Sequence, residues 1–332
     1  MGRIKKERSR LFMKILIIYY SQSGNTRKIA KAIARGARSA GAVVDVVKLK
    51  DASYQMMDDY DMIGIGSPVW KADTPNMHGF IDKMPDQKGK HCFAFNTHGA
   101  LPYLYFPIVL PNLKNHGLLP IGYRDWYGNV TMPGMPKPYY TYGHPDAQDV
   151  MEAEAFGREM AENSPKIAAG DTSLIYPDPE MDDKVFQQAM ICSNMLLCPT
   201  NPQGTFIRDA SKCLYPKCTK CMDNCTMGYI DLTKTPQKFG NRGDRCDDCH
   251  ECSFCLMLCP AGAIDTDPPI LEHAKGCIGK RHLTFEKMLD DAEKASKFRR
   301  LIPVEEVGFN TPYVIAHPRH PYFVIPKETD EE

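Results

Sequence analysis

Nine of the 13 cysteines in this 332-residue chain lie between positions 213 and 259. The last four have the spacing Cys-x2-Cys-x2-Cys-x3-Cys followed by Pro260, which is typical of thiolates that hold iron–sulfur clusters. The first four form a looser copy, with a longer first gap and Thr226 in the place of the proline. Zinc is the competing metal, although four-thiolate zinc sites usually come as two separated Cys-x2-Cys pairs. The eight candidate ligands are Cys213, Cys218, Cys221, Cys225, Cys249, Cys252, Cys255 and Cys259.

An internal repeat supports the looser copy. Segment 225–231 aligns with segment 259–265, because a glycine, an isoleucine and an aspartate follow the last cysteine of each run at the same offsets. This duplication resembles the bacterial two-cluster ferredoxins. The resemblance implies two 4Fe–4S clusters, each taking its fourth ligand from the other run. One cluster would have Cys213, Cys218, Cys221 and Cys259; the other would have Cys225, Cys249, Cys252 and Cys255. Cys246 stays open as a substitute for Cys249.

A second group of residues could hold a phosphate. The segment 21–26 combines hydroxyl side chains, a glycine and the start of an expected helix, and helix N-termini favour bound anions. An ordinary helix cap is the alternative, because serine, asparagine and threonine are good caps. Two further polar segments, 67–70 and 96–99, follow later expected strands. The candidate residues are Ser21, Gln22, Ser23, Gly24, Asn25, Thr26, Ser67, Pro68, Val69, Trp70, Asn96, Thr97, His98 and Gly99.

The elements that must position these residues alternate between strand and helix patterns. Continuous apolar runs predict strands buried on both faces, and apolar residues at four-residue spacing predict helices. Alternation of this kind indicates an α/β fold with a parallel sheet, whose ligands bind outside the carboxyl ends of the strands. The expected strands are 13–20, 42–49, 61–66, 91–96 and 118–123, with helices at 25–38 and 149–162.

With the phosphate loop and the two later segments in this order, residues 13–170 resemble the flavodoxin family. The resemblance implies a doubly wound five-stranded parallel sheet and non-covalently bound FMN, with the phosphate in the loop 21–26. Trp70 would flank the isoalloxazine, and His98, Tyr103 and Trp126 are the open candidates for the second flank. A nicotinamide site is less suited, because the fingerprint Gly-x-Gly-x-x-Gly does not follow the first strand.

The chain divides into several expected parts. After a disordered extension (1–12) come the flavodoxin-like domain (13–170), a linker with a helix (171–204), a small α+β ferredoxin-like domain (205–275), and a C-terminal helix with an extended tail (276–332). Lys plus Arg and Asp plus Glu both number 41, which argues against nucleic-acid binding through global charge. The longest apolar run, 15–20, is too short for membrane insertion. We expect a cytoplasmic protein with reduced thiols.

Together the two resemblances describe a flavodoxin/ferredoxin fusion. We expect an electron-transfer protein that relays electrons between two 4Fe–4S clusters and FMN, with redox proteins as donor and acceptor. The sequence does not decide the oligomeric state, and a homodimer is one of the alternatives. One alternative is an FMN-dependent reductase supplied through the clusters, for which the Tyr- and Pro-rich region 101–143 could form a pocket wall. Another is a redox sensor that docks through its tail.

Overall fold

The structure is a computed structural model of the whole chain. It describes residues 12–69, 73–100, 102, 104–130, 138–180, 205–225, 227–235, 237–239, 249, 253–267, 269 and 285–308. Several expected features lie outside these residues: the N-terminal extension, the helix of the linker, Trp70, Tyr103, Cys246, Cys252 and the tail beyond residue 308. None of the helices that the structure describes has the length and apolar composition that crossing a membrane requires.

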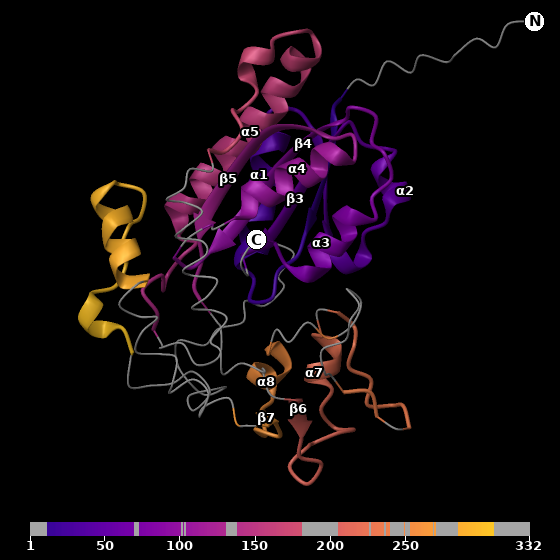
Figure 1. Cartoon of the computed structure of the whole chain (residues 1–332), viewed down its shortest axis with the longest axis vertical. Coiled ribbons are helices and arrows are strands. Elements are labelled where there is room, and N and C mark those ends of the chain that lie inside the picture. The colour runs from indigo at the N-terminus through magenta and orange to yellow at the C-terminus, as the bar shows by residue number, and fades with distance from the viewer. Residues whose placement is uncertain are drawn as a thin grey trace, which may run out of the picture.

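Five parallel strands form one sheet in the order β2-β1-β3-β4-β5 (Figure 1). The neighbours β1 and β3 mark the point where the strand order reverses, and in such sheets ligands bind there, outside the carboxyl ends of the strands. This is the flavodoxin-like, doubly wound order that the sequence predicts. The strands are β1 (Lys14–Tyr19), β2 (Val43–Lys48), β3 (Met62–Pro68), β4 (His91–His98) and β5 (Leu119–Tyr127).

Helices cover both faces of the sheet (Figure 1). One hydrophobic cluster packs α1 (Asn25–Ser39) and α5 (Ala147–Ala168) against one face. A second cluster packs α2 (Tyr54–Met57), α3 (Pro75–Asp82) and α4 (Tyr105–Asn115) against the other. Both faces of β1 and β3 are therefore buried, which explains their continuous apolar sequences. Short 3-10 turns follow β2 and α5, at η1 (Leu49–Asp51) and η2 (Thr172–Leu174).

Two glycines allow α1 and α5 to lie in close contact. A Cβ atom on Gly36 would lie 1.8 Å from the backbone oxygen of Glu154, and one on Gly157 would lie 2.0 Å from that of Ile33. No larger residue fits at either position without moving a helix. This contact fixes the direction of α1, whose N-terminus carries the predicted phosphate loop.

Residues 205–267, the cysteine-rich unit, form a separate small sheet. The antiparallel pair β6 (Thr205–Arg208) and β7 (Ile264–Asp267) joins the two ends of this stretch. Between them lie two short helices, α7 (Lys220–Asp223) and α8 (Phe254–Leu258). A small core of Phe206, Leu256 and Ile264 packs against several of the cysteines. The unit thus contains both strand and helix, in a chain order that brings its first and last residues together.

Residues 285–308, the C-terminal segment, pack against the larger α/β unit. They begin with a helix over 285–294 and include the turn η3 (Val304–Glu306). Phe285, Leu289 and Phe298 share a buried cluster with Tyr139 and Tyr140, which follow β5. The helix at the start of this segment thus packs on the body of the protein.

Candidate cofactor sites

The predicted phosphate loop lies between β1 and α1, at the reversal point of the sheet. Gly24 caps the helix with φ of 97°, a left-handed conformation that favours glycine, and no side chain caps the helix N-terminus. The loop closes on itself where the Gly24 N–H donates to Ser21 Oγ at 3.2 Å. An uncapped helix start presents backbone N–H donors and the positive end of the helix dipole, which together suit a phosphate.

The loop after β5 also reaches the phosphate loop, a contact that the sequence did not reveal. Asn25 Nδ2 donates to the carbonyl oxygen of Asn129 at 2.9 Å. Gly128 makes this approach possible, because a Cβ there would lie 2.9 Å from Asn25 Nδ2. The position of this loop directly after the fifth strand could have indicated the contact, because the carboxyl ends of all five parallel strands meet at one edge of the sheet.

The end of β4 contributes buried polar atoms to the same edge. The hydroxyls of Thr97 and Thr26 lie 2.8 Å apart and join β4 to α1. Asn96 is fully buried, yet neither atom of its side-chain amide has a hydrogen-bond partner. Buried amide atoms without partners are costly, and a ligand that offered a donor and an acceptor would remove that cost. Ser67, which faces Asn96 on β3, is also buried and lies 3.4 Å from the Tyr105 hydroxyl.

His98 ends β4 beside two residues of β5. Its Nε2 lies 2.8 Å from Asp125 Oδ2, and its ring lies 4.6 Å from that of Tyr127, centroid to centroid. Burial raises the pKa of Asp125, but the hydrogen bond and charge of His98 and the charge of Arg124 outweigh burial, so the pKa lies below its usual range. His98 Nδ1 is buried without a partner. The pair therefore leaves one imidazole nitrogen for another group.

The three candidates for the second flavin flank have different positions. Trp126 is buried and packs edge-on against Phe156 of α5, with ring centroids 5.9 Å apart, so it belongs to the core on the α1–α5 face. Strand alternation explains this, because neighbouring residues of β5 point to opposite faces. Trp126 is therefore part of the core rather than of the polar edge of the sheet. The His98 ring contacts Tyr127, the neighbour of Trp126 on β5, and so lies on the other face of the sheet. Tyr103 and Trp70 lie outside the described residues.

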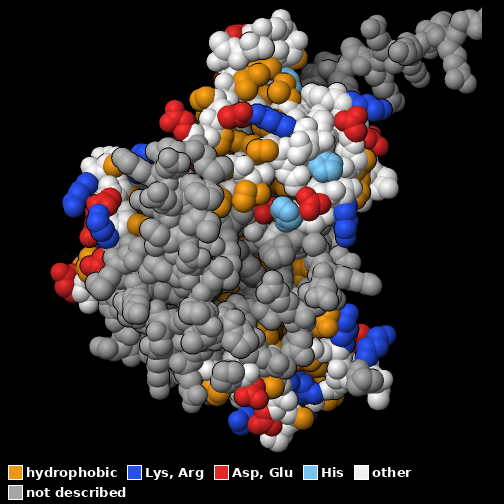
Figure 2. Space-filling view, in the orientation of Figure 1, with side chains coloured by type: hydrophobic (Ala, Val, Ile, Leu, Met, Phe, Trp, Pro, Cys, Tyr) orange, Lys and Arg blue, Asp and Glu red, His pale blue; other side chains and the backbone are white. Residues whose placement is uncertain are grey.

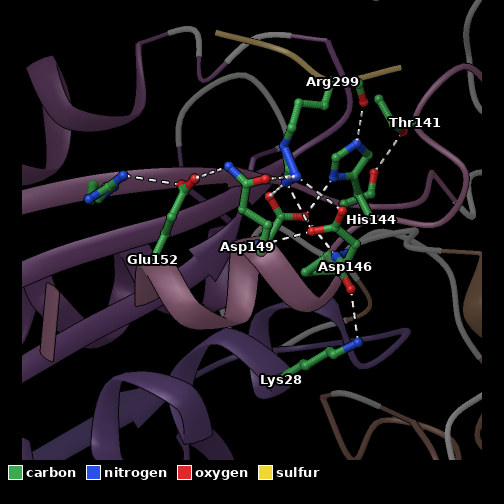
Figure 3. A network of polar contacts seen from close by, with 11 residues as sticks. Lys28, Thr141, His144, Asp146, Asp149, Glu152 and Arg299 are labelled. Carbon is green, nitrogen blue, oxygen red and sulfur yellow. Dashed lines mark hydrogen bonds and ion pairs between the residues drawn. The ribbon is translucent and has the colours of Figure 1, made fainter. Parts of the chain in front are cut away.

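A network of charges joins the C-terminal segment to the start of α5 (Figure 3). Arg299 contacts Asp146 at 2.9 Å and Asp149 at 2.8 Å. His144 lies between Asp149 Oδ2 at 2.6 Å and the Arg299 carbonyl oxygen at 2.7 Å. Both of these oxygens can accept a hydrogen bond from the imidazole ring. Burial raises the pKa of Asp149, but hydrogen bonds from His144 and Arg299 outweigh it and lower the pKa to about 2.

His144, Asp146 and Asp149 are residues of the types that bind metals, but their surroundings do not suit a metal ion. Ligand atoms of His144, Asp146 and Asp149 come within 4.8 Å of one another. The Arg299 guanidinium already contacts both carboxylates, and a second cation there would repel it. The network instead holds residues 285–308 beside the end of the sheet, where the Phe298 ring lies 4.7 Å from that of Tyr127.

In the cysteine-rich unit, one pocket brings together four distant cysteines. Cys213, Cys218 and Cys221 come from the first run and Cys259 from the second, and all four line this pocket. They are the four that the sequence assigns to one cluster. Burial raises the pKa of the Cys221 thiol, and the nearby Cys213 and Cys259 raise it further. Backbone hydrogen bonds to the sulfur lower the pKa, but by less than burial raises it. Thiol groups crowded in this way gain from binding a metal as thiolates.

The two runs also repeat in three dimensions. The N–H of Tyr229 donates to Cys225 Sγ, and the N–H of Ala263 donates to Cys259 Sγ, both at 3.2 Å. The glycine before each donor is left-handed, with φ of 61° at Gly228 and 58° at Gly262. Hydrogen bonds to cysteine sulfur are one of the means by which proteins tune iron–sulfur potentials. The repeat in sequence is therefore a repeat of local geometry around the sulfurs.

The second predicted ligand set is described only in part. Cys225, Cys249 and Cys255 are half-buried, whereas Cys252 lies outside the described residues. Cys92 lies apart from both cysteine runs and is fully buried on β4, where burial raises its thiol pKa. It packs among apolar side chains on the α4 face of the sheet.

Comparisons with known proteins match the larger α/β unit. The model of the family described as Flavodoxin matches residues 17–106. A curated NAD(P)H dehydrogenase (quinone) of Acidovorax ebreus is 28% identical over 199 residues, which are 47% of this chain and 99% of that protein. The "Probable flavodoxin 2" of Bacillus subtilis is 28% identical over 158 residues, 46% of this chain and 96% of the relative. About half of this chain is therefore flavodoxin-like.

Among solved structures, a flavodoxin from the domain Archaea has 22% identity and a TM-score of 0.37, and covers 46% of this chain and 99% of its own. The rubredoxin oxygen:oxidoreductase of Desulfovibrio gigas has 19% identity and a TM-score of 0.36, over 47% of this chain and 37% of its own.

Proposed function

We propose that this protein transfers electrons between two 4Fe–4S clusters in its cysteine-rich unit and an FMN at the edge of its five-stranded sheet. The observation that carries the proposal is the meeting of Cys213, Cys218, Cys221 and Cys259 around one pocket. Their spacing in sequence assigns these four, from two separate runs, to a single cluster.

Three features support FMN at the sheet edge. The uncapped start of α1 offers donors to a phosphate and lies at the reversal point of the strand order, where such folds bind FMN. On β4, next to β3, the buried Asn96 amide offers a donor and an acceptor without partners. Ser21, Ser23, Gly24, Asn25 and Thr26 would hold the phosphate. Asn96 would bind the polar edge of the flavin ring.

The spacing of the cysteines in the sequence favours iron–sulfur clusters over zinc. Four-thiolate zinc sites usually come as two separated Cys-x2-Cys pairs. Cys249, Cys252, Cys255 and Cys259 instead follow an x2, x2, x3 spacing that ends in Pro260, which is typical of iron–sulfur ligands.

The protein's part in this function is to hold and tune its cofactors. FMN, when bound, accepts one or two electrons, and each cluster accepts one. The backbone N–H groups of Tyr229 and Ala263 stabilise the more reduced, more negative cluster by donating to ligand sulfurs. No described residue needs to act as nucleophile or general acid in such a relay. Donor and acceptor would be redox proteins.

The test is a count of cofactors. Protein purified without oxygen should contain one FMN and about eight iron and eight sulfide per chain, as two 4Fe–4S clusters require. Cys221→Ser should lower the iron content by about four per chain, because it removes a ligand of one cluster. Cys92→Ser is the matched control and should leave the iron unchanged. Stoichiometric zinc in place of iron would contradict the proposal.

A second candidate function is reduction of a small molecule at the flavin. The unpartnered Nδ1 of His98 favours it, since a buried imidazole beside a flavin can bind or protonate a substrate. Several relatives are named NAD(P)H dehydrogenase (quinone). A soluble quinone that oxidises the reduced protein with saturation kinetics, and does so far more slowly in His98→Leu, would support this function over that of a carrier.

A further inference from the structure

The pocket of four cysteines has a rim that the electron-transfer function does not explain. Arg208 and Lys220 line the pocket, and Lys217 directly precedes one of its cysteines. Leu214 also lines the pocket, although 52% of its surface is exposed. Figure 2 shows Lys and Arg side chains beside hydrophobic ones, together with some Asp and Glu, on the lower part of the molecule, where Figure 1 places α7. We call Arg208, Leu214, Lys217 and Lys220 the basic rim.

The positive charge of this rim is largely uncompensated. Lys217 and Lys220 are exposed and form no ion pair with a carboxylate in the described part of the chain. Arg208 donates to the neutral amide of Gln237. By contrast, the nearby Lys212 is paired with Asp209 at 3.2 Å. The three cations of the basic rim are therefore without a carboxylate partner among the described residues.

The charges are also divided along the sequence of the cysteine-rich unit. Residues 205–239 contain six Lys and Arg against three Asp and Glu, whereas residues 240–267 contain two against six. The half that supplies three of the four pocket cysteines is therefore basic. Surface charge of one sign around a redox centre attracts partner proteins of the opposite charge. The exposed apolar side chain of Leu214 among these charges can be buried against such a partner.

We propose that the basic rim is the docking site of an acidic one-electron carrier protein, which exchanges electrons with the cluster held by Cys213, Cys218, Cys221 and Cys259. This inference rests on the proposed function. In the exchange, one electron leaves the reduced cluster and one metal centre of the partner is reduced by one electron. No bond breaks and no proton moves. Leu214 packs against the partner, and the lysines attract its carboxylates.

Two haem proteins of opposite charge test the proposal. The reduced, fully loaded protein is mixed in a stopped-flow instrument with oxidised cytochrome b5, which is acidic, or cytochrome c, which is basic, and haem reduction is followed by absorbance. At low salt, cytochrome b5 should react at a rate that falls about tenfold or more as salt rises, because screening removes electrostatic steering. The rate with cytochrome c should rise with salt.

Charge reversal locates the effect. Lys217→Glu with Lys220→Glu should slow the reaction with cytochrome b5 by about tenfold at low salt and flatten its salt dependence. The control, Lys50→Glu with Lys166→Glu, changes two exposed lysines of the larger unit and should leave the rate within about twofold. Equal rates with both haem proteins at every salt concentration would contradict the proposed docking site. This comparison uses the unmodified protein, so it does not depend on whether a variant folds.

Other outcomes also decide the matter. Iron content and the cluster signal in electron paramagnetic resonance are measured on the same samples, so protein without clusters contradicts the proposed function, whereas loaded protein without charge preference contradicts only the docking site. A salt-sensitive dimer that the double reversal dissociates, combined with equal rates for both haem proteins, would assign the basic rim to a second copy of the chain and overturn an acidic carrier as its partner.

Discussion

The buried carboxylate of Asp149 offers a sharp test of how the C-terminal segment is held. Its Oδ2 lies 2.6 Å from His144 Nδ1 and accepts from the Asp146 N–H at 2.7 Å, while Oδ1 accepts from Arg299 at 2.8 Å. Asp149→Asn keeps the shape but removes the charge, and the amide nitrogen cannot accept a hydrogen bond. The variant therefore loses the negative charge that faces the Arg299 guanidinium and weakens the hydrogen bonds that this carboxylate accepts.

The size of the effect follows from the pKa of this carboxyl. A fall from the ordinary value of 3.8 to about 2 on folding corresponds to about 2.4 kcal/mol of stability at neutral pH. Because the folded-state pKa is the lower one, this contribution is fully present above the ordinary pKa and is lost as the pH falls toward 2. Asp149→Asn should thus lower the free energy of unfolding by about 2–3 kcal/mol at pH 7, and by progressively less below pH 4.

Urea denaturation at several pH values measures this difference, and hydrogen exchange of residues 285–308 shows whether the segment opens first. Asp58→Asn is the matched control, since Asp58 is exposed and its loss should cost under about 0.5 kcal/mol. A loss at pH 7 no larger than that of the control, or one that does not shrink at low pH, would refute the reasoning.

Three further predictions concern other parts of the molecule. Gly157→Ala should destabilise the protein by about 1–3 kcal/mol or more, seen as a lower thermal midpoint, because its Cβ would lie 2.0 Å from the Ile33 oxygen; an unchanged midpoint would mean that α1 and α5 are not in close contact. Asn96→Leu should weaken FMN binding about tenfold in a fluorescence titration of the stripped protein, whereas Asn112→Leu on the exposed side of α4, where Asn112 bonds to Asp82, should not; equal affinities would remove Asn96 from the flavin site. Cys259→Ser should remove about four iron per chain and leave the Cys225 set loaded, and loss of the other cluster instead would reverse the assignment of ligands.

The sheet could be predicted because its strands carry unbroken apolar runs. β1 and β3 are buried on both faces, so nearly every residue in them is apolar, and the predicted ranges lie within a few residues of the observed ones. α4 was missed. It contains Pro111, a residue that normally interrupts helices, in a region whose Tyr and Pro content suggested a pocket wall. Its apolar face nevertheless packs on the sheet, and this packing decides its structure.

The sequence suggests a site where neighbours in sequence act together. The predicted phosphate loop is one short segment, and the cysteines follow a spacing rule. Contacts between distant segments left no such signal. The bond from Asn25 to Asn129 and the contact of Arg299 with Asp146 join residues more than 100 positions apart. Each residue alone has an ordinary polar type, so only the fold reveals what it does.

The central claim is that one chain holds three redox centres that exchange electrons. An anaerobic reductive titration followed by absorbance, with flavin, iron and zinc measured on the same sample, tests it most directly. Uptake should approach about four electrons per chain, two by FMN and one by each cluster. Uptake of about two electrons with flavin present and little iron, or with zinc in its place, would contradict the relay and leave a flavoprotein with a structural metal site.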